Sequence, residues 1–100
     1  ARGGGQDQLT MEAHSLRAAI ARKRGDASSA AAAWHRALEV APCEQTAAEA
    51  HFALAKLYEH QLKDLLLAHR HARWTLPAEG PESHGRRLGR LRRRLERARG

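Results

Sequence analysis

Apolar and small residues recur at helical spacing between Ala48 and Leu76, and this stretch holds the most regular pattern in the chain. Steps of three and four residues predict two helices that fold back on each other through a tight turn near residues 62–64. Antiparallel helices approach closely only where the crossing point lacks a bulky side chain, so we expect Ala55 and Ala68 to touch. The larger residues expected to fill the space around this contact are Leu54, Leu57, Tyr58, Leu65 and Leu76.

The residues before this hairpin predict a second pair of helices. The first is expected from Leu9 to about Arg24, and its predicted buried face consists of Leu9, Ala13, Leu16, Ala19 and Ile20. Gly25 and Asp26 are expected to end it and to cap the next helix, which runs over residues 27–40. Residues 1–7 contain three consecutive glycines and are expected to be a flexible linker.

The C-terminal twenty residues predict a fifth helix, over residues 82–99. Its narrow apolar stripe consists of Leu88, Leu91, Leu95 and Ala98. No run alternates between apolar and polar residues over the length of a strand, so the expected fold class is all-α.

Two units of this helical pattern resemble the tetratricopeptide repeat. The first unit, residues 11–44, matches its signature at Ala18, Ala30, Trp34, Ala37 and Pro42. The second unit, residues 45–79, matches it at Leu54, Ala55, Tyr58, Ala68 and Ala72. The resemblance implies one domain over residues 8–99, in which two right-handed helical hairpins stack and residues 82–99 cap the open end.

In tetratricopeptide arrays the first helix of each hairpin lines an inner groove, so the resemblance also implies a partner-binding surface. Its expected residues in the second unit are Glu49, Phe52, Lys56, Glu59 and His60, opposite Glu12, Ser15, Ala19, Arg22 and Lys23 of the first unit. Leu66, Leu67 and Trp74 stand where the repeat has polar residues. They are expected either to lie under the last helix or to form an exposed patch, with Leu67 and Trp74 as contacts for a partner or a second copy.

The net charge of +7 belongs almost entirely to the last twenty residues. Residues 1–80 hold ten Lys and Arg against nine Asp and Glu, whereas residues 81–100 hold eight Arg against two Glu. This arginine helix is either a solvated cap or a contact for nucleic-acid phosphates, and the candidate contacts are Arg86, Arg87, Arg90, Arg93, Arg94 and Arg97. No aromatic residues lie between the arginines to stack on bases.

The sequence offers little for catalysis or metal binding. None of the seven histidines lies three or four residues from another, as two ligands on one helical face would. Neither a phosphate-binding glycine loop nor a nucleophile motif is present, so we expect no enzyme activity, no cofactor and no metal. The single Cys43 cannot form an internal disulfide, and no apolar run reaches the length of a membrane span, so we expect a cytoplasmic protein without a membrane partner.

The run AKLYEHQLKD, the alanines that follow it and the tail RRLGRLRRRLERAR resemble the C-terminal tetratricopeptide region of bacterial ribonuclease-H-like exonuclease proteins. The resemblance implies a fragment that packs on, or presents substrate to, a parent nuclease domain whose acidic residues are absent here. The expected function is therefore a non-enzymatic module that binds a protein or peptide partner or that parent domain. The alternative is an accessory nucleic-acid-binding domain that uses the arginine helix.

Overall fold

The computed structural model describes residues 4–99, with side chains from Gln8 onward, and this part of the chain contains helices and no strands. The elements are α1 (Gly4–Lys23), α2 (Ala27–Glu39), α3 (Glu44–Lys56), the π-helical turn η1 (Leu57–Gln61), α4 (Leu65–Ala72), α5 (Leu76–Glu79) and α6 (Pro81–Arg99). The predicted all-α class is confirmed. The short helix α5 and the π-helical turn were not predicted.

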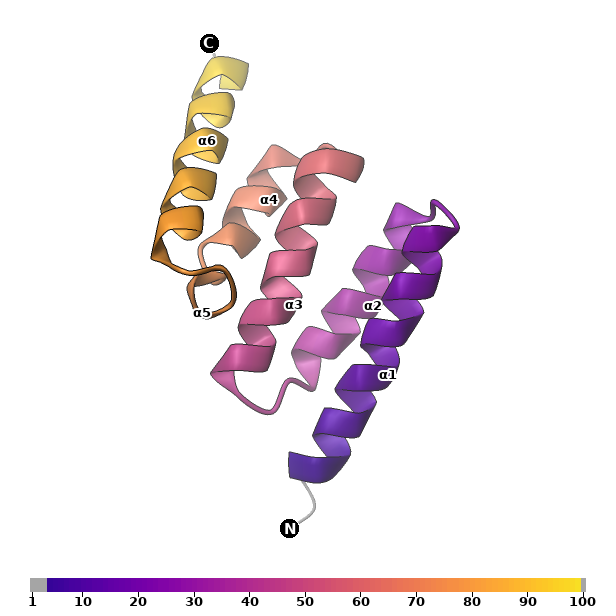
Figure 1. The fold of residues 1–100 in the computed structure, drawn as a ribbon. Coiled ribbons are helices and arrows are strands. Elements are labelled where there is room, and N and C mark those ends of the chain that lie inside the picture. Colours follow the sequence, from indigo (N-terminus) through magenta and orange to yellow (C-terminus); the bar gives the residue numbers. More distant parts are fainter. Residues whose placement is uncertain (1–3, 100) are drawn as a thin grey trace.

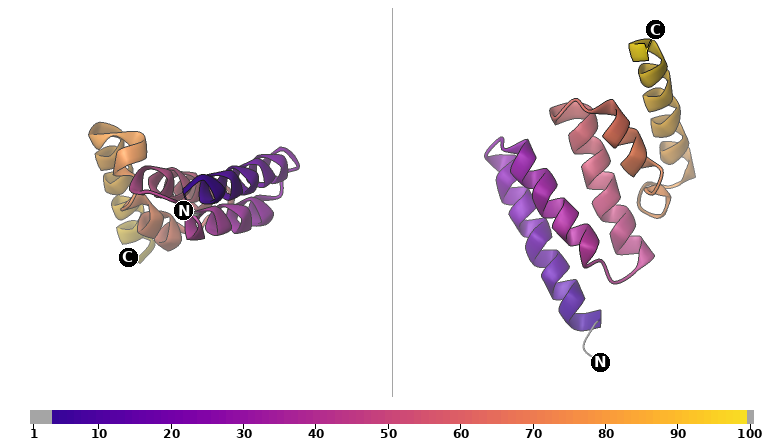
Figure 2. Two further views of the ribbon diagram at one scale, coloured as in Figure 1. Left: turned by 90° about the horizontal axis from the view of Figure 1, so that it is seen from below. Right: turned by 180° about the vertical axis from the view of Figure 1, so that it is seen from behind.

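The long helices follow one another as antiparallel neighbours (Figure 1). Helix α1 packs on α2, α2 on α3, α3 on α4, and α4 on α6. The helices lie in two layers, with α1 and α3 in one and α2 and α4 in the other, and the principal extents are 50 × 30 × 18 Å (Figure 2). Figure 1 shows the α1–α2 hairpin at one end of the molecule and α6 at the other.

Helix α1 differs from its prediction in two ways. It begins at Gly4, so a flexible linker over residues 4–7 is wrong, while residues 1–3 lie outside the described chain. Its buried residues are Met11, Ala18 and Ala21, whereas the predicted buried face is exposed, with Leu9 at 69%, Leu16 at 63% and Ile20 at 45%. The facing side of α2 consists largely of alanines, and small residues of α1 pack closest against it.

Both hairpin turns lie where the sequence predicted them. Gly25 takes the left-handed conformation with φ of 75°, and the Asp26 carboxylate caps α2 by accepting a hydrogen bond of 3.0 Å from the Ser29 backbone N–H. In the second turn Lys63 has φ of 58°, and Asp64 caps α4 by accepting from the Leu67 N–H at 3.1 Å. An aspartate carboxylate thus caps the N-terminus of the second helix in each hairpin.

The core is built mainly from alanines, which bring the helices close together. Ala55, Ala68, Ala72 and Leu91 are fully buried in one cluster between α3, α4 and α6, which agrees with the expected meeting of Ala55 and Ala68. A second cluster surrounds Leu54 and Leu57 between α1, α2 and α3. Leu76, predicted to fill the hairpin, is instead 45% exposed because it begins the short helix α5.

The π-helical turn η1 continues α3 without a break and widens its last turn. The Leu62 N–H donates to the carbonyl of Leu57, five residues back, at 2.9 Å. Three successive residues then face three different neighbours: Leu57 packs in the cluster with α1 and α2, Tyr58 reaches His35 of α2, and Glu59 reaches α6. Such turns are rare and are frequent at functional sites.

Candidate functional site

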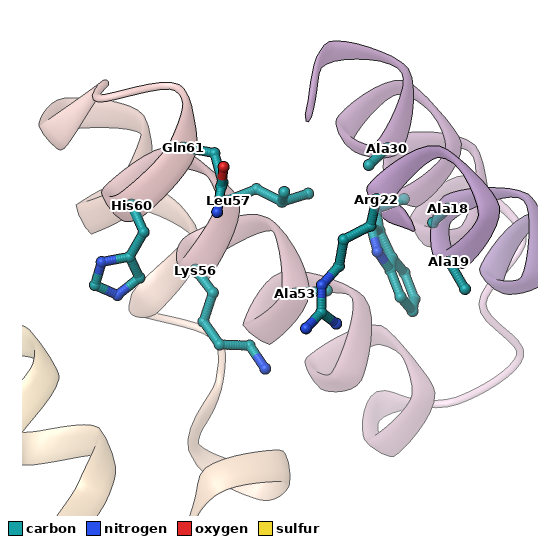
Figure 3. A pocket seen from close by; sticks show the side chains of 10 residues that line it. Ala18, Ala19, Arg22, Ala30, Ala53, Lys56, Leu57, His60 and Gln61 are labelled. Atoms are coloured by element: carbon teal, nitrogen blue, oxygen red, sulfur yellow. The ribbon is translucent and has the colours of Figure 1, made fainter. Parts of the chain in front are cut away.

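A cavity of about 340 Å³ opens between α1, α2 and the end of α3, and we call it the α1–α3 groove (Figure 3). Trp34, Leu57 and several alanines give it apolar walls, while Arg22, Lys56, His60 and Gln61 supply its polar groups. Figure 3 shows the side chains of Arg22 and Lys56 extending into the opening from opposite sides. The groove therefore combines an apolar surface with two cations.

The charge in the α1–α3 groove is positive and unbalanced, because none of the described side chains that line it is acidic. Partial burial lowers the pKa of Lys56, and the nearby guanidinium groups of Arg87 and Arg22 lower it further, against a smaller opposite effect of Glu79. Mutual repulsion of this kind is relieved when an anion enters between the cations. The groove is thus suited to a carboxylate that is attached to an apolar group.

The groove brings together four of the residues that the tetratricopeptide resemblance implied. Ala19 and Arg22 come from the first unit, and Lys56 and His60 come from the second. Other expected groove residues do not line the cavity: Glu12, Ser15, Lys23, Glu49, Phe52 and Glu59. The predicted groove is therefore smaller than expected and lies at the end of α3 that leads into η1.

Phe52 supports the groove from its side. The Lys56 Nζ lies 4.2 Å from the centre of the Phe52 ring, and the Arg87 guanidinium carbon lies 5.2 Å from it. Cations are attracted to the face of an aromatic ring, so Phe52 holds both side chains in place. Its role is to position Lys56, one turn further along α3.

Glu59 is not available as a partner-binding residue, because its side chain is only 1% exposed. The carboxylate accepts hydrogen bonds from Arg90 at 2.8 and 2.9 Å, from Arg87 at 3.1 Å and from Arg94 at 3.2 Å. The Arg90 hydrogen bonds lower the pKa of Glu59 most, and they outweigh the opposing effect of burial. The expected groove contact is thus wrong, and Glu59 instead fastens η1 to α6.

Glu79 extends this ionic cluster to α5. It accepts from Arg87 Nε at 2.9 Å, from Ser83 at 2.8 Å and from the Thr75 hydroxyl. Burial favours the neutral acid, but the hydrogen bonds from Thr75, Arg87 and Ser83 prevail and lower the pKa of Glu79. Arg87 therefore bridges two buried carboxylates.

The arginines proposed for nucleic acid fall into two groups. Arg87, Arg90 and Arg94 face the molecule and contact Glu59, so a phosphate would have to compete with a buried carboxylate for them. Arg86, Arg93 and Arg97 are exposed, and of these Arg86 lies 3.7 Å from Glu82 on the surface. The sequence alone does not separate the two groups, since the buried acid comes from a distant element.

The predicted patch around Trp74 remains largely uncovered by α6. Trp74 is 57% exposed and Leu66 is 62% exposed, while Leu67 is half-buried. The Arg73 guanidinium carbon lies 5.8 Å from the Trp74 ring centre. Of the two predicted outcomes for these residues, the exposed patch is the one that occurs for Leu66 and Trp74.

A cluster of histidines was missed in the sequence because each member comes from a different helix. His71 of α4 lies against His35 of α2, His51 of α3 and Tyr58 of η1. Spacing along one helix cannot reveal a cluster whose members come from different helices. Within the described residues, no group of three or more His, Cys, Asp or Glu side chains is arranged to hold a metal ion.

Comparison with known proteins adds no assignment: no family model, curated protein or solved structure matches the chain. The helices described over residues 4–99 include none with the length and apolar character needed to cross a bilayer.

Proposed function

We propose that this chain is a tetratricopeptide-like module that binds a protein or peptide partner in the α1–α3 groove. The observation that carries the proposal is the pairing of Arg22 and Lys56, from different hairpins, over an apolar cavity without an acidic residue. Clefts with apolar walls and a few convergent polar groups are the usual form of a binding site. The antiparallel order of the helices and the small residues at their contacts support the repeat assignment.

The groove chemistry narrows the partner to a segment that carries an acidic residue beside an apolar one. A carboxylate between Arg22 and Lys56 forms charge-assisted hydrogen bonds, which are about twice as strong as neutral ones. An adjacent leucine or aromatic side chain then packs on Trp34 and Leu57. Such a segment can belong to a separate protein or to a parent nuclease domain, as the resemblance implies.

Selection from a random peptide display library tests this proposal. We expect the native chain to enrich peptides with Asp or Glu next to a large apolar residue. Loss of both cations in the Arg22→Ala/Lys56→Ala variant removes hydrogen bonds to a charged group, so binding of the selected peptides should weaken by roughly tenfold or more. Isothermal titration calorimetry measures the difference.

Arg17→Ala/Arg36→Ala is the matched control for that experiment, since both residues are exposed and neither lines the groove. It removes two positive charges without touching the cavity and should bind the selected peptides as the native chain does. Equal binding by the native chain and the Arg22→Ala/Lys56→Ala variant, or equal weakening by the control, would count against the groove.

The second candidate function is nucleic-acid binding, and the exposed outer face of α6 favours it. Arg93 and Arg97 are exposed and make no ion pair within the described residues. Contacts of this kind give an affinity that falls with salt. Fewer arginines are proposed as phosphate contacts than the sequence suggested, because Arg87, Arg90 and Arg94 form ion pairs with Glu59.

An oligonucleotide titration over a range of salt concentrations tests this candidate with the Arg93→Ala/Arg97→Ala variant. If both residues contact phosphates of a duplex, the slope of log affinity against log salt should become shallower by about 1.8. Arg17→Ala/Arg36→Ala changes the charge equally on exposed positions of α1 and α2 and should leave the slope unchanged. Failure of the native chain to bind near physiological ionic strength would remove this candidate.

A further inference from the structure

Three histidines from three helices and Tyr58 lie in one contact cluster, with His71 at its centre. The Nδ1 atoms of His51 and His71 are 3.0 Å apart, and His35 Nε2 lies 2.9 Å from the Tyr58 hydroxyl. The ring of His71 stacks on Tyr58 at 5.7 Å between centres, and the His35 ring meets His71 at 5.3 Å. The cluster, which we call the histidine trio, therefore joins α2, α3, η1 and α4.

The contact between His51 and His71 depends on their state of protonation. One Nδ1 must carry a hydrogen and the other must be bare for a hydrogen bond to form. A first added proton leaves one donor and one acceptor, but a second places two N–H groups against each other across 3.0 Å. His35, 5.3 Å from His71, adds a third charge when it is protonated.

The surroundings of His71 and His51 oppose the protonation of these two histidines. Burial lowers the pKa of His71 to about 4, and the neighbouring His51, His35 and Arg70 act in the same direction. Burial also lowers the pKa of His51, followed by the effect of His35.

Charged groups on the adjoining elements do not reverse this balance. Asp64, at the start of α4, acts on Tyr58, whose pKa is raised chiefly by burial. From α6, Arg92 adds positive charge beside His69 of α4, where burial has the larger effect on pKa. The groups that act on His71 itself are all positive when protonated.

We infer that the histidine trio is an acid-sensitive latch that holds α2, α3 and α4 together at neutral pH and loosens when it is protonated. The latch adjoins the α1–α3 groove, because Trp34 of the groove precedes His35 and Leu57 of the groove precedes Tyr58. Acid should thus alter the groove walls. This effect on binding rests on the function proposed for the groove, whereas the loosening of the helices does not.

The lowered pKa values of His71 and His51 determine how the stability of the fold changes with pH. A histidine whose pKa is lowered by folding stabilises the native state above its unfolded pKa, and that stability is lost as the pH falls toward the folded pKa. For His71 the window lies between the ordinary value of 6.5 and about 4. Between pH 7 and pH 5, His71 alone should reduce the folding equilibrium constant by roughly 20-fold.

Two measurements on the intact chain test the latch. Proton NMR titration of the histidine rings should show His71 titrating near pH 4 and His51 below 6.5. Urea unfolding should show the expected fall in the equilibrium constant between pH 7 and pH 5. The His71→Phe variant keeps a ring against Tyr58 without a titrating group, so it should lose most of this pH dependence.

His14→Gln is the control, because His14 lies on α1, outside both the trio and the α1–α3 groove, and it should retain the native pH dependence. In a Trp74→Phe background, emission from Trp34 should change with the same midpoint as His71 if the groove responds. Titration of all seven histidines near 6.5 would overturn the latch, and constant Trp34 emission would overturn its link to the groove. Neither result depends on whether any peptide binds at neutral pH, so the two proposals fail separately.

Discussion

Replacing Glu59 by Gln should lower the free energy of unfolding by about 3 kcal/mol, the lower end of the range for breaking a buried ion pair. The substitution keeps the shape of the side chain but leaves Arg87, Arg90 and Arg94 without the carboxylate that they share. The side chains of Arg90 and Arg94 are 41% and 34% exposed, so water compensates them in part. Arg87, at 12%, has less access to water.

Urea denaturation at pH 7 measures this loss, and Glu82→Gln is the matched control. Glu82 pairs with Arg86 where both side chains are largely exposed, at 92% and 70%, and such a pair contributes about 0–1 kcal/mol. Hydrogen exchange should also show earlier opening of α6 in the Glu59 variant, because the ionic cluster is one of the contacts that hold α6 in place. Equal stability of the two variants would mean that the cluster contributes no more than a surface pair.

Protonation of the Glu59 carboxylate should also lower the stability of the fold in a second, more acidic pH range. The pKa of Glu59 is lowered in the folded chain, so its contribution is complete above the ordinary value of 4.5 and is lost as the pH falls below it. His71 of the trio acts at higher pH, between 6.5 and about 4. The Glu59→Gln variant should therefore still become less stable between pH 7 and pH 5. It should lack only the further fall in stability at more acidic pH, which depends on the Glu59 carboxylate.

Local signals in the sequence located the helices and turns well. Gly25 and Asp26 act through their own backbone and nearest neighbours, so their roles are readable from the chain alone. The contact between Ala55 and Ala68 can also be predicted from the sequence, because a short turn makes the second helix pack on the first. The whole alanine pattern of residues 48–72 is local in this sense.

Contacts between distant segments were not readable in the same way. Glu59 is one acidic residue among several in the second hairpin, and only the packing of α6 makes it a buried partner of three arginines. The trio likewise depends on the approach of three helices. On α1 the larger apolar residues suggested the wrong face, because the closeness of α2 favours alanine over leucine at their contact.

The π-helical turn connects the candidate sites. Leu57 lines the groove, Tyr58 belongs to the histidine trio and Glu59 holds α6, so three adjacent residues serve three surfaces. A change in the packing of η1 is therefore expected to alter the groove, the histidine trio and the contact with α6. This arrangement explains how protonation of the trio can reach the groove without any residue in common.

Leu54→Ala should lower the free energy of unfolding by about 2–5 kcal/mol, because Leu54 is fully buried where α3 meets α1 and α2 and its loss leaves a cavity. Alanines surround it and cannot move far enough to fill the space, which favours the upper part of the range. Leu16→Ala and Leu66→Ala remove the same atoms from positions that are 63% and 62% exposed, so each should change stability by less than about 0.5 kcal/mol. Urea denaturation of the three variants compares them directly. A large loss from Leu16→Ala would mean that the outer face of α1 is buried in solution, as the sequence pattern alone had suggested.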